Sequence, residues 1–336
     1  MIETLLANPW LCVFIIIVGF ILLVKGADWL VDGASAIAKR YGISDLVIGL
    51  TVVAFGTSMP EFVVNMVSVT DGATDLAITN ILGSNIINTF VILGITALIY
   101  PVISQKRSRD FDIPLSIMAG IIVFVAVTIN LPLTSGPFSE MGHSISRGGG
   151  LVLLMMFAYF IYNTFRHAKD HPEEQSGEEV VVKPMSIGKA IALVVVGLTG
   201  LVVGGEMIVK SAVSLASQMG VSEAVIGLTV VALGTSLPEL ATSAMAAFKK
   251  NCDIALGNVI GSNIFNVFFI LGTSATIRPL PSYSGIELDA WIAALGSMII
   301  WLIVKTNHER KIPRWGGAIL LIIYAVYLTY RLCNAG

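Results

Sequence analysis

The sequence is poor in charge, histidine and cysteine, and each shortage excludes a class of protein. Only 12% of its 336 residues are charged and its mean hydropathy is +0.85, whereas soluble domains carry about 25% charged residues. The four histidines fall in segments expected to be loops, which excludes a histidine-based metal site or proton relay among apolar helices. Cys12, Cys252 and Cys333 lie too far apart for a disulfide framework or a thiolate metal site. The composition therefore indicates an integral membrane protein.

Ten apolar stretches are long enough to cross a bilayer, which requires about 20 residues. They are 10–36, 44–68, 75–99, 111–130, 147–165, 187–217, 222–247, 253–277, 285–305 and 314–331. We therefore expect an all-α integral membrane protein with ten transmembrane helices. The first and sixth stretches, as helices that rise about 1.5 Å per residue, exceed the hydrocarbon thickness, so they should be tilted or broken.

A polar, glutamate-rich linker at 166–185 separates five stretches from five. It predicts a first five-helix repeat at 1–165 and a second at 186–336. Five crossings leave the second half starting on the opposite side of the membrane, so the two repeats must be inverted. Inverted repeats are a transporter architecture, in which the substrate site lies near the midplane between the halves.

Basic residues predict the orientation, because cytoplasmic loops are enriched in lysine and arginine. The side that carries both termini holds only Arg147, Arg278 and Arg331. The opposite side holds fifteen: Lys39, Arg40, Lys106, Arg107, Arg109, Arg166, Lys169, Lys183, Lys189, Lys249, Lys250, Lys305, Arg310, Lys311 and Arg314. We expect a protein of the cell inner (plasma) membrane with a cytoplasmic linker and both termini outside.

An internal repeat relates 42–101 to 220–279 at a constant offset, without insertion or deletion. The first 20 residues of the two copies are identical at 15 positions and end in Gly-Thr-Ser-x-Pro-Glu. A second block, Gly-Ser-Asn-x-x-Asn, follows in both copies. The two copies should therefore adopt the same local structure.

Each copy holds a glutamate, Glu61 or Glu239, deep inside an apolar stretch. A charged side chain at the membrane centre costs about 2.5–3.5 kcal/mol on insertion scales, so such residues face a bundle interior or a water-filled cavity. A single glutamate could be a structural carboxylate bonded to a neighbouring helix. Two glutamates in matched settings favour a functional site.

A proline precedes each glutamate and should disturb the helix. Pro60 and Pro238 lack an N–H and free carbonyls about four residues earlier, near 54–56 and 232–234. Unpaired backbone at membrane depth persists only where protein, water or an ion satisfies it. A simple proline kink is the other explanation. Hydroxyl groups three and four residues before each glutamate share its helical face and favour an ion site; they are Thr57, Ser58, Thr235 and Ser236.

The second block adds oxygen atoms one helical turn apart. Its candidate ligands are Ser84, Asn88, Ser262 and Asn266. The remaining asparagines of these helices fit interhelical hydrogen bonds better than direct ligation; they are Asn80, Asn85, Asn258 and Asn263.

The assembled candidate ligands are all oxygens. Hard cations choose such ligands, and Ca²⁺ takes about six to eight of them in flexible geometry. Without sulfur or imidazole the site suits Zn²⁺, Cu⁺ or Fe²⁺ poorly. Two carboxylates neutralise one Ca²⁺ or several monovalent ions that share the space, and mutually exclusive occupancy is a physical basis for exchange. The full set is Ala54, Thr57, Ser58, Glu61, Ser84, Asn88, Ala232, Thr235, Ser236, Glu239, Ser262 and Asn266.

These motifs resemble the alpha repeats of the cation/Ca²⁺ exchanger superfamily, most closely its prokaryotic Na⁺/Ca²⁺ branch. The resemblance implies an antiporter whose second, third, seventh and eighth helices form a core, across which the first and sixth slide. It implies the ligand set above except Asn266, where some relatives, including K⁺-dependent exchangers, have aspartate. The proton-coupled branch has Gly-Asn where this chain has Gly-Thr-Ser, which favours Na⁺ as counter-ion.

We therefore predict electrogenic Na⁺/Ca²⁺ antiport by alternating access, with an H⁺/Ca²⁺ or K⁺-dependent exchanger as the nearest alternative. The sequence has no phosphate-binding loop, so an ion gradient rather than ATP should drive transport. A passive channel stays open as an alternative, whereas a hydrolase using Ser58 or Ser236 lacks a nearby histidine base. We expect a monomer in a lipid bilayer with no enzyme activity, cofactor or nucleic-acid partner.

Five further acids are weaker candidates. Asp28, Asp32 and Glu206 lie toward the cytoplasmic part of the two long stretches, where interface or gate roles compete with simple solvation. Asp71 and Asp75 lie in a short outer loop and should be solvated.

Overall fold

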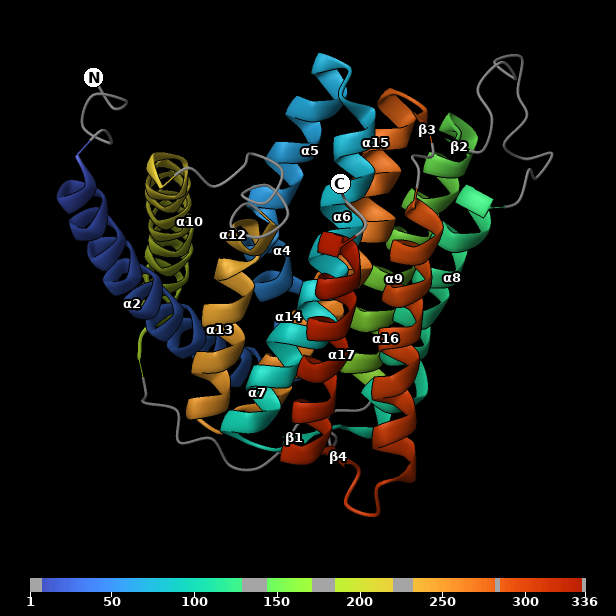
Figure 1. Ribbon diagram of the computed structural model, residues 1–336. Coiled ribbons are helices and arrows are strands. Elements are labelled where there is room, and N and C mark those ends of the chain that lie inside the picture. The colour runs from blue at the N-terminus through green and yellow to red at the C-terminus, as the bar shows by residue number, and fades with distance from the viewer. Residues whose placement is uncertain (1–7, 129–143, 171–184, 220–231, 282–284, 334–336) are drawn as a thin grey trace.

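The computed structural model describes residues 8–128, 144–170, 185–219, 232–281 and 285–333, and these form a helical bundle (Figure 1). The helices of the first half are α2 (Pro9–Tyr41), α3 (Asp45–Ile48), α4 (Ala54–Thr57), α5 (Met59–Asp71), α6 (Thr74–Ile86), α7 (Leu93–Ile99), α8 (Ile113–Thr128) and α9 (Arg147–Asp170). Those of the second half are α10 (Ile187–Gln218), α12 (Ala232–Thr235), α13 (Leu237–Phe248), α14 (Cys252–Ile264), α15 (Gly272–Ile277), α16 (Ile286–Thr306) and α17 (Arg314–Cys333). Among the described residues, four π-helical segments, at 49–53, 87–92, 108–112 and 265–271, continue these helices without a loop.

Within the described residues, eight helices are long and apolar enough to cross a membrane, and one bent pair makes a ninth. The bent pair joins Asp45–Thr57 to Met59–Asp71 at 46°. The predicted boundaries of these nine spans lie within five residues of the helix ends, and the largest differences are at the ends of α2 and α9. The remaining predicted span, 222–247, is described only from Ala232 onward, so its first part lies outside the described residues. The all-helical membrane architecture is confirmed.

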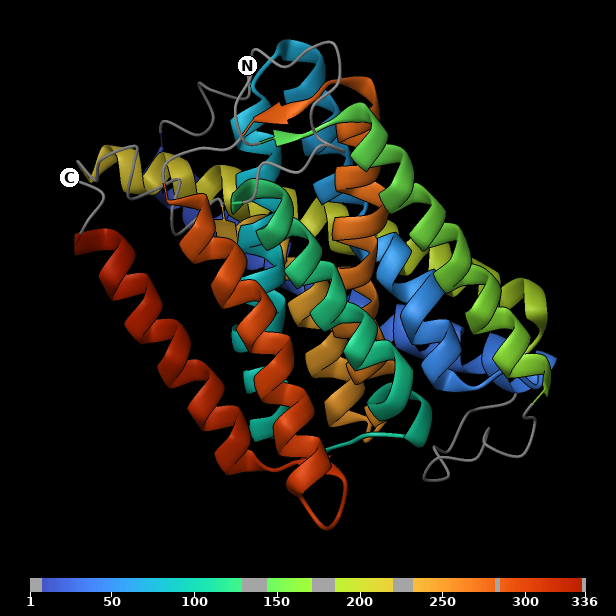
Figure 2. The same cartoon turned by 90° about the vertical axis from the view of Figure 1, so that its right-hand side faces the viewer.

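The two long helices, α2 and α10, are unbroken and cross the bundle obliquely, as Figure 2 shows. Small residues let them touch through their backbones: a Cβ on Gly26 would lie 2.7 Å from the carbonyl oxygen of Gly197, and a Cβ on Gly197 equally close to that of Gly26. Such contacts are typical of membrane helices, which pack by close approach rather than by the hydrophobic effect. The same approach recurs at Gly19 with Gly204 and at Gly33 with Ala190. The residue numbers of the contacts rise along α2 while they fall along α10, so the two helices run antiparallel.

Two short strand pairs join the halves at opposite ends of the bundle (Figure 1). Strand β1 (Val102–Ile103) pairs with β4 (Lys311–Ile312), and β2 (Ser144–Ile145) pairs with β3 (Leu280–Pro281). Strands β1 and β3 stand at equivalent positions of the two repeats. Each strand pair therefore consists of one strand from each half of the chain.

The last helix of each half also packs on the other half. Helix α17 meets α7 where Gly317 contacts Gly94, and α9 meets α15 where Gly150 contacts Gly272. Gly94 and Gly272 are again equivalent positions of the two repeats. At the centre, almost every residue of α14 is buried. This arrangement places the two motif copies side by side in the interior.

Candidate cation site

The chain bends at Ser58, two residues before the proline of the first motif. Helix α4 ends at Thr57 and α5 begins at Met59, so Pro60 occupies the first turn of a new helix, where its missing N–H does no harm. The second copy repeats the break at Ser236, between α12 and α13. The two breaks set the motif side chains at helix ends that face the interior.

One expectation about this bend is wrong. The carbonyl of Ala54 is not freed, because it accepts the Ser58 N–H at 3.0 Å and the Thr57 hydroxyl at 3.4 Å. The proline instead starts a new helix, so the backbone bond that ends at Ser58 survives. Ala232 opens α12 at the edge of the described residues, and only its backbone is placed. Both carbonyls remain predicted ligands, and at Ala54 ligation would compete with these hydrogen bonds.

The two glutamates lie together in the interior, each bonded to the motif of the other half. Ser58 donates a hydrogen bond of 2.9 Å to Glu239, and Ser236 donates one of 3.5 Å to Glu61. Glu61 is fully buried and Glu239 is 1% exposed. Ser84 also donates to Glu61 at 3.5 Å. The arrangement is reciprocal, because each glutamate accepts a hydrogen bond from the serine of the other motif copy.

Six predicted ligands present buried oxygen atoms that have no hydrogen-bond partner among the described residues. They are Glu61 Oε2, Glu239 Oε2, Asn88 Oδ1, Thr235 Oγ1, Ser262 Oγ and Asn266 Oδ1. A buried polar atom without a partner is costly and requires an explanation. A bound hard cation supplies one, because all six atoms are oxygens of the kind that Ca²⁺ and Na⁺ accept.

Three of the four ambiguous asparagines form the predicted interhelical hydrogen bonds. Asn85 donates to the carbonyl of Asn263 at 3.3 Å, and Asn263 donates to the hydroxyl of Thr89 at 2.8 Å. Asn266 donates to Asn85 at 3.0 Å, which orients its own free oxygen. Asn258 bonds to Thr57 at 3.1 Å. The fourth, Asn80, has a buried amide nitrogen without a partner in the part of the chain that the structure describes.

Two residues that form hydrogen bonds within the site were not predicted from the sequence. Asn65 donates to the carbonyl of Glu61 at 3.0 Å, and Ser243 accepts a hydrogen bond of 2.9 Å from Asn258. Both lie four residues after a motif glutamate, on the same helical face. The four-residue spacing from the glutamate could have identified both residues. The two copies carry different residues at this position, however, so the internal repeat does not point to it.

The weaker acidic candidates take defined places. Asp28 and Asp32 form ion pairs of 2.7 and 2.6 Å with Lys249, which ties α2 to the end of α13 and supports the interface role. Glu206 is exposed and pairs with Lys210 along its own helix. Asp71 and Asp75 are exposed, as predicted, but Asp71 ends α5 and Asp75 lies in the first turn of α6, so neither is in a loop. The expectation for His167 is also wrong, because it lies in the last turn of α9 rather than in a loop, still far from the motif helices in sequence.

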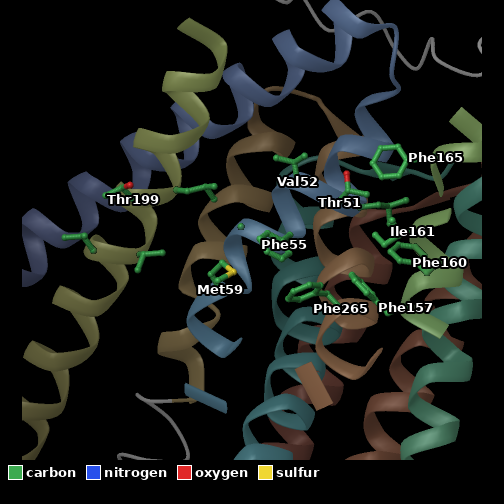
Figure 3. Close-up of a pocket in the computed structure, with 15 residues that line it drawn as sticks. Thr51, Val52, Phe55, Met59, Phe157, Phe160, Ile161, Phe165, Thr199 and Phe265 are labelled. Atoms are coloured by element: carbon green, nitrogen blue, oxygen red, sulfur yellow. The ribbon is translucent and has the colours of Figure 1, made fainter. Parts of the chain in front are cut away.

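A large cavity of about 750 Å³ lies beside the site but is apolar (Figure 3). It separates α10 from α9, and the side chains of Phe55 and Met59 point into it from the middle of Figure 3. Its two hydroxyls, of Thr51 and Thr199, donate to carbonyls of their own helices at 2.6 and 2.9 Å. The residues that line this cavity include no carboxylate, so the candidate site is the buried oxygen cluster.

Comparisons with known proteins agree with this geometry. The model of the family "Sodium/calcium exchanger protein" matches residues 11–166 and 189–333, and so covers both motif copies. The sodium/calcium exchanger MaX1 of Methanosarcina acetivorans is 30% identical, over 94% of this chain and 96% of that protein. The inner membrane protein YrbG of Escherichia coli (strain K12) is 36% identical, over 79% of each chain.

A solved structure extends the agreement to three dimensions. The sodium-calcium exchanger NCX_Mj, soaked with 10 mM Na⁺ and zero Ca²⁺, matches with a TM-score of 0.80 and 31% identity, covering 96% of this chain and 99% of that one. The agreement thus spans nearly the whole of both chains, in sequence and in fold. The chain is therefore a multi-pass membrane protein that belongs to the sodium/calcium exchanger family.

Proposed function

We propose that this protein is an electrogenic Na⁺/Ca²⁺ antiporter that works by alternating access. The observation that carries the proposal is the reciprocal contact between the halves, in which Ser58 bonds to Glu239 and Ser236 to Glu61. These contacts connect the two buried glutamates, and the predicted ligands include six buried oxygens without a partner among the described residues. The proposed ions, Na⁺ and Ca²⁺, are those of the related sodium/calcium exchangers.

The charge of the candidate site explains the exchange. Two carboxylates balance one Ca²⁺, and the six oxygens without partners supply a coordination number in the range that Ca²⁺ prefers. Several Na⁺ ions can occupy the same oxygens, but not together with Ca²⁺, because the summed positive charge would be uncompensated at low dielectric. Binding of one ion type therefore displaces the other. If more than two Na⁺ exchange for one Ca²⁺, each cycle moves net charge.

The proposed ligands are the twelve residues predicted from the sequence, with Glu61 and Glu239 shared by both ions. The proposed architecture is ten helices in two inverted repeats, 1–165 and 186–336. Its support is the antiparallel register of α2 and α10 and the strand pairs at opposite ends of the bundle. We further propose a functional monomer in the cell inner membrane, with the linker at 166–185 in the cytoplasm and both termini outside.

The test is Ca²⁺ uptake by purified protein in proteoliposomes. Vesicles loaded with Na⁺ and diluted into choline should accumulate radioactive Ca²⁺, and vesicles without a Na⁺ gradient should not. An inside-positive potential should speed uptake, because exit of more than two Na⁺ for each Ca²⁺ removes positive charge. Uptake that ignores the Na⁺ gradient would reject the proposal.

Matched variants locate the site. Glu61→Gln and Glu239→Gln should each abolish Na⁺-driven uptake, since they remove the charge that binds Ca²⁺. Glu287→Gln, at an exposed position in the first turn of α16, should leave it unchanged. Normal exchange by both buried variants would remove these glutamates from the site.

The alternatives differ in the driving ion. Uptake driven by a pH gradient in the absence of Na⁺ would indicate H⁺/Ca²⁺ exchange, and a requirement for K⁺ together with Na⁺ would indicate a K⁺-dependent exchanger. Asn266 provides no third carboxylate to accept an extra cation, which favours the Na⁺/Ca²⁺ reaction.

A further inference from the structure

One asparagine joins the two halves of the site. The Thr57 hydroxyl of α4 donates to the Asn258 side-chain oxygen of α14 at 3.1 Å, and the Asn258 amide donates to the carbonyl of Glu239 at 3.3 Å. The same amide reaches Ser243 at 2.9 Å. We call the hydrogen bonds that link Thr57, Asn258 and the Glu239 carbonyl the Asn258 bridge. All three residues are buried.

The equivalent bridge in the other copy is not formed. Asn80 is the repeat equivalent of Asn258, and Thr235 is the repeat equivalent of Thr57. The amide nitrogen of Asn80 and the hydroxyl of Thr235 are buried, yet no hydrogen bond joins them within the described ranges. Helix α12, which carries Thr235, packs against α6, which carries Asn80. The groups needed for a second bridge are therefore present but unjoined.

The two asparagines lie toward opposite ends of the bundle. Each is in the second turn of its helix, Asn80 in α6 and Asn258 in α14. Figure 1 shows these helices starting at opposite ends, α6 at the top and α14 at the bottom. The bottom end is also the one at which Lys249 binds Asp28 and Asp32 of α2. The formed bridge thus belongs to the end where α2 is fastened to the core.

We propose that Asn258 and Asn80 are positioning residues that close the two ends of the site in alternation. In the present state the Asn258 bridge closes the lower end. In the opposite access state the Thr57–Asn258 bond opens, and Asn80 bonds to Thr235 and to the carbonyl of Glu61. This inference rests on the proposed exchange by alternating access. It identifies two sets of hydrogen bonds, one at Asn258 and one at Asn80, that form and break in turn during that motion.

A permanent difference between the copies is the competing explanation. Asn65 already donates to the Glu61 carbonyl, and the residue at its repeat position is Ser243. A carbonyl oxygen has two lone pairs, so Asn65 leaves room for a second donor at Glu61. It also leaves the Asn80 amide without a partner among the residues that the structure describes, which a permanent arrangement would not explain. The two explanations predict different behaviour of Asn80 variants.

The experiment compares Asn258→Ala, Asn80→Ala and the double variant in oriented vesicles. The apparent affinity for Ca²⁺ is measured on each face under Na⁺-gradient exchange, and the outer half-saturation constant is divided by the inner one. Loss of one net hydrogen bond changes a two-state equilibrium about fivefold. Asn258→Ala should raise this ratio about fivefold, because the state open to the lower, basic side becomes more populated.

Asn80→Ala should lower the ratio by a similar factor, and the double variant should return to within about twofold of the wild type, because the two losses cancel. Shifts in the same direction, or no shift with Asn80→Ala, would overturn the proposal in favour of a permanent difference. A merely structural role would reduce flux without moving the ratio. If an alanine variant does not fold, Asn258→Ser and Asn80→Ser test the same signs.

Hydrogen exchange separates this inference from the proposed function. Without transported ions, Asn258→Ala should speed amide exchange at the α13–α14 turn, and Asn80→Ala should slow it by favouring the present state. Wild-type protein that fails to exchange Na⁺ for Ca²⁺ would reject the function, while these amide rates would still decide the alternation. Equal rates in both variants would reject it.

Discussion

The contact between α2 and α10 can be tested at a single glycine. In Gly197→Ala the new methyl group would lie 2.7 Å from the carbonyl oxygen of Gly26 and 2.8 Å from the amide nitrogen of Leu30. Both atoms belong to backbone, so no side-chain rotation relieves the clash. The two helices must instead separate locally by several tenths of an ångström. Gly188→Ala on the same helix is the matched control, because nothing lies within 4 Å of its added Cβ.

The magnitude follows from two opposing effects. Forcing one extra methyl group into a packed interface costs about 1–3 kcal/mol. Alanine in place of glycine also stabilises the helix by up to about 1 kcal/mol. The control variant Gly188→Ala gains this helix stabilisation without the clash. Gly197→Ala should therefore be less stable than Gly188→Ala by about 1–3 kcal/mol.

Thermal unfolding in detergent, followed by loss of the monodisperse chromatographic peak, measures this difference. The apparent melting temperature of Gly197→Ala should fall below that of Gly188→Ala, and its exchange rate should fall as well if α2 and α10 move as a unit. Equal melting temperatures would refute the assignment of this close backbone contact.

Three further predictions concern polar contacts. Ser58→Ala should weaken apparent Ca²⁺ affinity more than Ser236→Ala in the flux assay, because the Ser58 bond to its glutamate is 2.9 Å and the other 3.5 Å; the reverse order would contradict the reciprocal geometry. Asp112→Asn should destabilise the protein by about 3–5 kcal/mol, because it leaves the buried charge of Arg107 unpaired; a thermal shift no larger than that of Glu287→Gln would argue against burial of the pair. Lys249→Gln should cost only about 0.5–1 kcal/mol, since its ion pairs with α2 are partly exposed, and added salt should shrink the effect; a salt-independent loss would exclude the ion pairs as its cause.

The sequence predicted most of the fold because the membrane reduces the choices. Each span needs a long apolar run, and the constant offset of the repeat pairs the two motifs without ambiguity. The burial of Glu61 and Glu239 followed from the cost of charge in hydrocarbon. The contact of each glutamate with the other half agrees with the proposed inverted repeats, in which equivalent residues meet near the symmetry axis.

The remaining features depend on geometry that no local pattern encodes. The bend at Ser58 was expected to free the carbonyl of Ala54, but a new helix start preserved its hydrogen bonds. The bonds of Asn258 depend on the rotation of α14 against α4, which spacing within one helix does not determine. Likewise, Asp28 was recognisable as an acid near one end of a span, while its partner Lys249 lies in the other half of the chain.

The packing of α9 and α17, each against the other half of the chain, bears on how such a chain arose. A polypeptide comprising one half alone would expose the glycine-lined faces of α7 and α9 and leave its strand edge unpaired. It could satisfy them only by meeting a second copy of itself inserted upside down. In the proposed inverted architecture, a single-half ancestor would therefore have been an obligate pair of oppositely inserted subunits, which gene fusion later joined. In the proposed orientation, the unequal distribution of lysine and arginine between the two sides of the membrane then keeps each half in its own direction.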